Sequence, residues 1–305
     1  MISVCMSTYN GEKYIYKQLQ SIYEQIYKID EVIICDDCSN DNTVKIIAQF
    51  ICDNDLKNWK LYCNEKNKGY PQNFYYAMQF CTGDIVFLAD QDDVWVKDKI
   101  ANMMSIMDEN VHIKLLASKW GIIDEQDNIV KEVVRGKLRG GKDCQRVTLH
   151  DILYYYNWPG MSMCYRKEFG EEVLLRSKAS NIPHDMALGI MATEIDGFYC
   201  SNSKNQYHRR HANNVSVEEF SISKMLKKER KLREIRQYIA MLQEILRCDC
   251  LRKMENINKL ETKKIIMEER LSNLQKKSRG RMLKQYFKYF GDIRLATVIC
   301  DWIIM

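Results

Sequence analysis

The segment VFLADQDDVW (residues 86–95) decides the fold of this 305-residue chain. An apolar run that is typical of a buried strand ends abruptly in three carboxylates, Asp90, Asp92 and Asp93. Like charges this close together raise the free energy of the folded state unless a cation or a ligand neutralises them. Because a turn needs only one carboxylate, the cluster predicts a binding site at the end of a core strand.

Apolar runs alternate with helical patterns over the first ninety residues. Strands are expected within residues 1–7, 30–37, 59–67 and 83–93, and helices within residues 10–25, 40–54 and 69–81. A βαβαβαβ order predicts an α/β protein with a Rossmann-like, mostly parallel sheet flanked by helices on both faces.

Polar residues follow three of these strands, where parallel sheets bind their ligands. Thr8, Tyr9 and Asn10 follow the first strand, and Asp36 and Asp37 follow the second. We therefore expect both groups to meet the aspartates of residues 90–93 at one crevice. Asp and Asn also favour ordinary turns, and for Asn10 the two interpretations stay equally open.

Oxygen ligands favour Mg²⁺ or Mn²⁺ over zinc. Asp90 and Asp92, two positions apart, can face the same way and share one divalent cation, which in turn can bind a diphosphate. Such a cation neutralises the charge that builds on a departing nucleoside diphosphate.

The second half of the chain has a less regular pattern. Strands are expected within residues 113–124 and 128–136, a loop at 135–143, and a helix, a Pro-Gly turn and a strand within 149–169. A helix and a strand follow within 183–200, and long amphipathic helices dominate after residue 216. The predicted units are residues 1–110, 111–215 and 216–305.

Charge is distributed unevenly along the chain. Residues 216–305 hold 21 Lys and Arg against 12 Asp and Glu, whereas residues 1–215 hold 25 against 29. The basic helical extension suits an anionic membrane surface or a partner protein better than an active site. Packing on the catalytic domain, or homodimer formation through the C-terminal helices, is an equally open interpretation. The mixture of charges argues against a nucleic-acid site.

Four motifs in order resemble glycosyltransferases of family two, which have the GT-A fold. They are SVCMSTYNGEKYI (3–15), EVIICDDCSNDNT (31–43), NKGYPQNFYYAM (67–78) and GDIVFLADQDDVW (83–95), which contains the Asp-x-Asp of the family. Cys38 stands where the family usually has Gly, a departure that affects the turn after the second strand.

The resemblance implies a donor site at these motifs. The residues expected to bind the nucleotide sugar are Thr8, Tyr9, Asn10, Glu12, Asp36, Asp37, Asn73 and Asp90. Asp90 and Asp92 are expected to bind the metal, and Asp93 to position the sugar.

The second half carries the residues that the resemblance implies for the acceptor and for catalysis. Inverting members of the family use an Asp at a helix start as general base, and NIPHDMALGIMA (181–192) places His184 and Asp185 there. A helix N-terminus keeps such a carboxylate ionised. Asp185 is the expected base, with His184 beside the acceptor; a capping Asp without chemistry is the alternative.

Two further segments resemble the family's sugar and diphosphate sites. NWPGMSMCYRKEF (157–169) offers Trp158 and Gly160 to the sugar and acceptor pocket. YHRRHANNVS (207–216) offers Arg210 to the diphosphate and His211 to the metal.

The chain most resembles rhamnosyl- and related hexosyltransferases of bacterial surface polysaccharides. This resemblance implies an inverting enzyme that uses Mn²⁺ or Mg²⁺, a UDP- or dTDP-sugar donor and a polyprenyl-diphosphate-linked glycan acceptor. The first ten residues, MISVCMSTYN, have no signal-peptide pattern. We therefore expect a cytoplasmic protein that lies peripherally on the inner face of the cell membrane.

Three competing interpretations are weaker. Gly136 to Asp143 follow phosphate-loop spacing but lack its hydroxyl residue. Cys35 and Cys38 have the spacing of a zinc or redox motif without a second pair. A non-catalytic scaffold is disfavoured because the Asp-x-Asp and the candidate base are both present.

Overall fold

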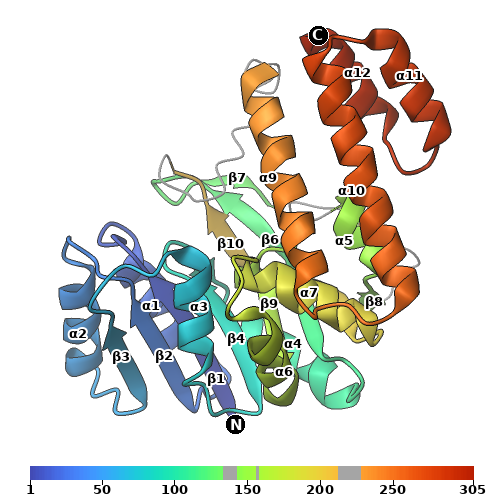
Figure 1. Ribbon diagram of the computed structural model, residues 1–305. Helices are drawn as coiled ribbons and strands as arrows, with labels where there is room; N and C mark the ends of the chain where they lie inside the picture. Colours follow the sequence, from blue (N-terminus) through green and yellow to red (C-terminus); the bar gives the residue numbers. More distant parts are fainter. Residues whose placement is uncertain (133–142, 156–157, 212–227) are drawn as a thin grey trace.

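A mixed sheet with helices on both faces forms the body of the molecule (Figure 1). The computed structural model describes residues 1–132, 143–155, 158–211 and 228–305. Within these residues the strands are β1 (Ile2–Thr8), β2 (Glu31–Asp36), β3 (Trp59–Cys63), β4 (Ile85–Asp90), β5 (Val94–Trp95), β6 (Leu115–Ile123), β7 (Ile129–Lys131), β8 (Cys144–Arg146), β9 (Met163–Arg166) and β10 (Phe198–Arg209).

Helices follow most of the strands. They are α1 (Ile15–Tyr23), α2 (Thr43–Asp53), α3 (Tyr70–Met78), α4 (Lys99–Glu109), α5 (Leu149–Tyr155), α6 (Lys167–Ser177), α7 (His184–Glu194), α9 (Lys228–Arg247), α10 (Met254–Gln275), α11 (Arg279–Lys288) and α12 (Leu295–Ile304), with a 3₁₀ turn, η2, at Gly160–Ser162.

The sheet order confirms the predicted α/β class. The strands run β3-β2-β1-β4-β9-β6-β10-β5, and β1 pairs in parallel with both β2 and β4. Antiparallel β9 lies between β4 and β6 and joins the two halves into one sheet. The strands predicted within residues 113–124 and 149–169 correspond to β6 and β9, whereas α4 and α6 were not predicted.

Alternation along the strands divides the core into two layers. In β1, Cys5 faces a cluster that includes α3, α5, α6 and α7, whereas Val4 and Met6 face a cluster that includes α1, α2 and α4. In β4, Leu88 and Phe87 divide in the same way. Both faces of the parallel strands are therefore apolar, as burial under helices requires.

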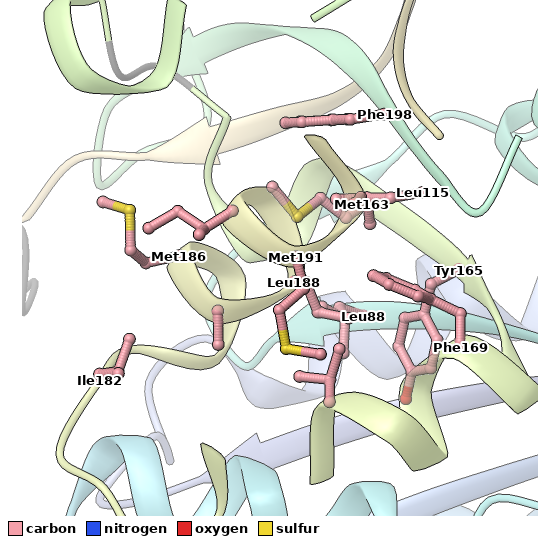
Figure 2. Packing of buried hydrophobic residues seen from close by; sticks show 14 of the residues in the cluster. Leu88, Leu115, Met163, Tyr165, Phe169, Ile182, Met186, Leu188, Met191 and Phe198 are labelled. Atoms are coloured by element: carbon pink, nitrogen blue, oxygen red, sulfur yellow. The ribbon is translucent and has the colours of Figure 1, made fainter. Parts of the chain in front are cut away.

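Helix α7 is buried along its whole length. Figure 2 shows Met186, Leu188 and Met191 packed among Leu115, Phe198 and other core side chains. A helix that is apolar on all sides is stable only inside a core. The first turn of α7, which carries the candidate base, is consequently held rigidly.

The helical extension packs partly on this core. Leu242 and Ile245 of α9 and Leu260 of α10 belong to the same buried cluster as α7. At the C-terminal end of α7, the Glu194 carboxylate accepts hydrogen bonds from the backbone of Arg252 and Lys253, at the start of α10. The packing interpretation therefore holds for α9 and α10.

Helices α11 and α12 lie farthest from the sheet (Figure 1). Asp301 of α12 is buried and accepts two hydrogen bonds from the guanidinium of Arg270, of 2.6 and 2.8 Å. Within the described residues, no helix is both long enough and apolar enough to cross a membrane. The phosphate-loop-like segment from Gly136 and the predicted start of the extension at 216–227 lie outside the described residues, apart from Asp143.

Candidate active site

The ends of β1, β2 and β4 lie side by side, so the predicted polar groups share one edge of the sheet. Thr8 is paired in register with Asp36, and Ser7 with Asp90. We call this the strand-end edge.

The loops after β1 and β2 are hydrogen-bonded to each other. Asp36, which is buried, accepts hydrogen bonds from Thr8 Oγ1 at 2.9 Å and from Ser39 Oγ at 2.6 Å. Asn10, with φ of 48°, donates from its backbone to Ser39 Oγ and accepts from the backbone of Asn40. These residues thus form a rigid wall for the crevice.

Glu12 and Tyr9 extend the same wall. Glu12 Oε2 accepts hydrogen bonds from the backbone and the side chain of Asn42. The backbone of Tyr9 exchanges two hydrogen bonds with the side-chain amide of Gln91, and the Tyr9 side chain is 45% exposed. Tyr9 is therefore accessible to a ligand.

Asp37 organises the loop before α3. Its carboxylate accepts hydrogen bonds from Asn64 Nδ2 at 2.8 Å and from the backbone of Lys68 and Gly69 at 2.7 and 2.8 Å. Cys38, at the departure from the family's glycine, has φ of 66°, a left-handed conformation that costs a non-glycine residue about 1–2 kcal/mol. Cys35 and Cys38 are both free thiols.

Asn73 lies inside the fold. It is fully buried, and its Nδ2 donates to Ser7 Oγ at 2.7 Å and to the Cys35 carbonyl at 2.8 Å. Its amide therefore joins α3 to the first two strands, which is a structural task that differs from the predicted contact with the donor.

Asp92 and Asp93, which follow β4, contact the end of β10 and the residues after it. His208 Nδ1 lies 3.0 Å from Asp93 Oδ1, and His211 Nε2 lies 2.8 Å from Asp92 Oδ2. The buried Arg209 donates from Nε to the Asp92 carbonyl at 2.9 Å. Three residues of the HRRH segment thus hold the aspartate loop.

The carboxylates at this edge are crowded electrostatically. Burial and the charges of Asp93 and Asp92 raise the pKa of Asp90 well above its ordinary value. Burial alone would lower the pKa of His208, but the charge and hydrogen bond of Asp93, together with the charges of Asp92 and Asp90, outweigh burial and raise the pKa to about 9. The loop therefore favours positive charge beside it.

Asp90, Asp92 and His211 fit a hard divalent cation by the chemistry of their donor atoms. Asp92 Oδ2 and His211 Nε2 share a hydrogen bond of 2.8 Å, which a bound ion would have to replace. Among the described residues no three such side chains are already gathered around one point. Phosphate oxygens and water would therefore have to complete the coordination.

His184 and Asp185 form the first turn of α7, as predicted. His184 is buried, stacks on Phe74 with 3.9 Å between ring centroids, and has no hydrogen-bond partner at either ring nitrogen. Burial lowers its pKa to about 4, so the ring is neutral. Asp185 Oδ1 accepts a hydrogen bond from the backbone of Met186 at 2.8 Å.

Gly160 lies beside this turn. A Cβ atom at Gly160 would lie 2.6 Å from His184 Nε2, so only glycine allows this close approach. Trp158 packs edge-on against Phe198, with 5.6 Å between ring centroids. The Pro-Gly turn therefore contacts the helix that carries Asp185.

The carboxylates of the strand-end edge and of the first turn of α7 influence each other electrostatically. The charge of Asp185 contributes to the raised pKa of Asp90. Tyr70, the first residue of α3, is 36% exposed, and partial removal from water together with the charges of Asp185 and Asp90 raises the pKa of its hydroxyl. The charges of both carboxylates therefore act on the Tyr70 hydroxyl.

The structure places the backbone of Arg210 next to the end of β6. The backbone of Arg210 donates to the Ile123 carbonyl at 2.9 Å, and its contact with the diphosphate stays a prediction. His208, Arg209 and Tyr70 were not predicted from the sequence as site residues. The HRRH segment was a usable signal for the first two, but Tyr70 had none beyond its position after Gly69.

Comparison with known proteins connects this geometry to a family. The family described as "Glycosyl transferase family 2" matches residues 3–164, more than half of the chain. The glucosyltransferase WfgD of Escherichia coli, named for UDP-Glc and an α-D-GlcNAc-diphosphoundecaprenol acceptor, is 30% identical over 142 residues, 47% of this chain and 54% of WfgD. The dTDP-rhamnosyl transferase RfbG of Shigella flexneri is 28% identical over 219 residues, 68% of this chain and 72% of RfbG.

The match spans about half the length of the first curated relatives. Among solved structures, the mannosyltransferase PcManGT of Pyrobaculum calidifontis, in complex with GDP-Man and Mn²⁺, is similar with a TM-score of 0.61. The two are 14% identical, and the similarity covers 99% of this chain and 84% of PcManGT. It shows that the predicted GT-A fold is correct.

Proposed function

Because the chain belongs to glycosyltransferase family 2, we propose that it transfers a hexose from a nucleoside diphosphate sugar to a hydroxyl group of a cell-surface glycan, with inversion at the anomeric carbon. The observation that carries this proposal is the strand-end edge, where Asp90 and Asp92 stand beside Thr8 and Asp36, together with the charge of Asp185, which contributes to the raised pKa of Asp90. A donor edge and a candidate base are the two parts that such a transfer needs.

The donor would lie over the strand-end edge. Tyr9, Asn10, Glu12 and the Asp36–Asp37 loop would surround the base and ribose, with the diphosphate near Asp90. WfgD and RfbG are named for UDP and dTDP sugars, which supports a UDP- or dTDP-sugar here.

Transfer would proceed by direct displacement. The acceptor oxygen attacks the anomeric carbon, its proton passes to Asp185, and the bond between that carbon and the diphosphate oxygen breaks, with the electron pair leaving on the diphosphate. Asp185 lies in the first turn of α7, at the positive end of the helix dipole.

Asp90, Asp92 and His211 would hold Mn²⁺ or Mg²⁺. When bound, the ion stabilises negative charge on the leaving diphosphate. Independently of the ion, His208 places a positive charge beside Asp93, which keeps the aspartate loop in position for the donor.

We further propose that the acceptor is lipid-linked and that α11 and α12 contact an anionic membrane surface. WfgD is named for a diphosphoundecaprenol acceptor. Five large apolar side chains on the two helices and the loop between them are between 51% and 74% exposed: Phe287, Phe290, Leu295, Ile299 and Ile303. Basic residues stand among them, as membrane-surface helices require.

A thermal-shift screen tests the proposed function. UDP, dTDP, GDP and CDP are compared with and without Mn²⁺, and one nucleotide should stabilise the protein by about 2.7 kcal/mol at a hundredfold excess over its Kd. We expect UDP or dTDP to give this stabilisation only when Mn²⁺ is present. No shift with any nucleotide would refute a donor site at the strand-end edge.

A further inference from the structure

Lys99 is completely buried, which is unusual for a lysine. It is the first residue of α4, and its Nζ donates a hydrogen bond of 2.7 Å to the carbonyl of Met161. The ammonium lies 3.8 Å from the centroid of the Trp95 ring. Burial lowers the pKa of Lys99 to about 7, although the charges of Asp93 and Asp90 oppose this shift.

The two ends of this contact belong to different halves of the site. On one side, Lys99 follows the aspartate loop by six residues and lies within the electrostatic reach of Asp93. On the other side, Met161 belongs to turn η2, whose Gly160 is pressed against His184 and Asp185. Lys99 therefore connects the strand-end edge with turn η2, which contacts the candidate base.

An apolar residue would fill this position at a lower energetic cost. Taking an ammonium out of water costs several kcal/mol, and replacement by a hydrophobic residue of similar volume is often neutral or stabilising. The surroundings include Trp95 and Cys164, which would suit a methionine. What a methionine cannot supply is a donor to the Met161 carbonyl and a positive charge near Asp93, whose Oδ2 is buried without a hydrogen-bond partner.

We propose that Lys99 is a positioning residue, which fixes turn η2, and through it the first turn of α7, at a set distance from the aspartate loop. This inference rests on the proposed transfer reaction, in which the anomeric carbon must lie between the diphosphate and Asp185. A displacement of one ångström in such an arrangement can reduce the rate by about a hundredfold.

The test compares Lys99→Met with Lys97→Met, a change at an exposed lysine whose side chain is 73% exposed. The first readout is hydrogen exchange of backbone amides in residues 158–164 and 183–188, which needs no substrate. We expect faster exchange in both segments for Lys99→Met only. Exchange identical to the wild type in both segments would overturn the proposal.

The second readout is transfer itself. Lys99→Met should lower kcat by at least about tenfold while the Kd for the nucleotide stays nearly unchanged. Loss of nucleotide binding together with kcat would overturn a positioning role, because Lys99 would then belong to the donor site. A wild-type protein that neither binds nucleotide nor transfers sugar would refute the proposed function, whereas the exchange result would still decide the role of Lys99.

If Lys99→Met does not unfold cooperatively on heating, Lys99→Arg takes its place in both measurements. The arginine keeps the charge but has a longer arm, so we expect it to displace turn η2, to speed exchange in both segments and to lower kcat. Wild-type exchange and kcat in this variant would overturn the proposal.

Discussion

His211 Nε2 lies 2.8 Å from Asp92 Oδ2, although the two residues are 119 positions apart in the sequence. The contact forms because β10 pairs with the two-residue strand β5, directly after the aspartates. The end of β10 therefore lies next to the strand-end edge and completes the candidate site.

The Asp92–His211 pair predicts dependence on a divalent cation. His211→Gln and Asp92→Asn should each weaken Mn²⁺ binding and lower transfer by about 10–100-fold, because ligand-shell changes have effects of this size. Titration with Mn²⁺ in the presence of the nucleotide measures the affinity. Asp98→Asn and His112→Gln, at exposed positions, are the controls; equal Mn²⁺ affinity in all four variants would contradict the assignment.

His184 predicts a pH dependence of stability. Its pKa is about 4 in the folded protein and near 6.5 when unfolded, so between these values only the unfolded chain binds the proton. The free energy of unfolding should therefore rise as the pH increases from 4 to 6.5. The expected contribution is about 1–3 kcal/mol.

Urea unfolding of the wild type and of His184→Leu across this pH range measures the effect. The leucine variant should lose less stability at low pH, whereas His112→Gln should follow the wild type. Parallel curves for the wild type and His184→Leu would show that His184 is not buried in a neutral form.

The hydrogen bonds of Glu194 should contribute to the free energy that holds the helical extension on α7. Glu194→Ala removes the acceptor for two backbone N–H groups and for Asn256 Nδ2, and should lower the free energy of unfolding by about 1–3 kcal/mol. Hydrogen exchange should increase at the start of α10. The exposed Glu261 offers a matched control, since Glu261→Ala should change stability by less than about 0.5 kcal/mol; similar effects of both changes would contradict this attachment.

The exposed side chains of α11 and α12 predict membrane binding. The double change Phe287→Ser and Phe290→Ser should reduce flotation with anionic vesicles and leave the Tm nearly unchanged, because both rings are more than 70% exposed. Added salt should also weaken binding. If the wild type does not float, and sedimentation instead gives a dimer that the double change dissociates, the surface is a dimer interface.

The strand-end edge could be predicted from the sequence because local patterns encode it. The apolar runs that end in Thr8, Asp36 and Asp90 mark core strands, and parallel pairing places their ends together. Asp185 could be located in the same way, since its position at a helix start is a local feature.

Long-range pairing explains most of what the sequence did not reveal. Strand β5 is only two residues long and has no alternating pattern, so its pairing with β10, which brings His208 and Arg209 to the aspartates, could not be predicted from the sequence. Because lysine is normally exposed, the burial of Lys99 could not be predicted from the sequence. The structural hydrogen bonds of Asn73 were not predicted either, because a polar residue in a family motif suggested a ligand contact, and this contact stays a prediction.

The account depends most on Asp185, and one comparison tests it directly. Sugar transfer and nucleotide affinity are measured on Asp185→Asn and on Glu168→Gln, a control at an exposed acid in the first turn of α6. The account predicts that Asp185→Asn loses about 10²–10⁴-fold in transfer rate and keeps nearly the wild-type Kd for the nucleotide. Wild-type turnover by Asp185→Asn would contradict it.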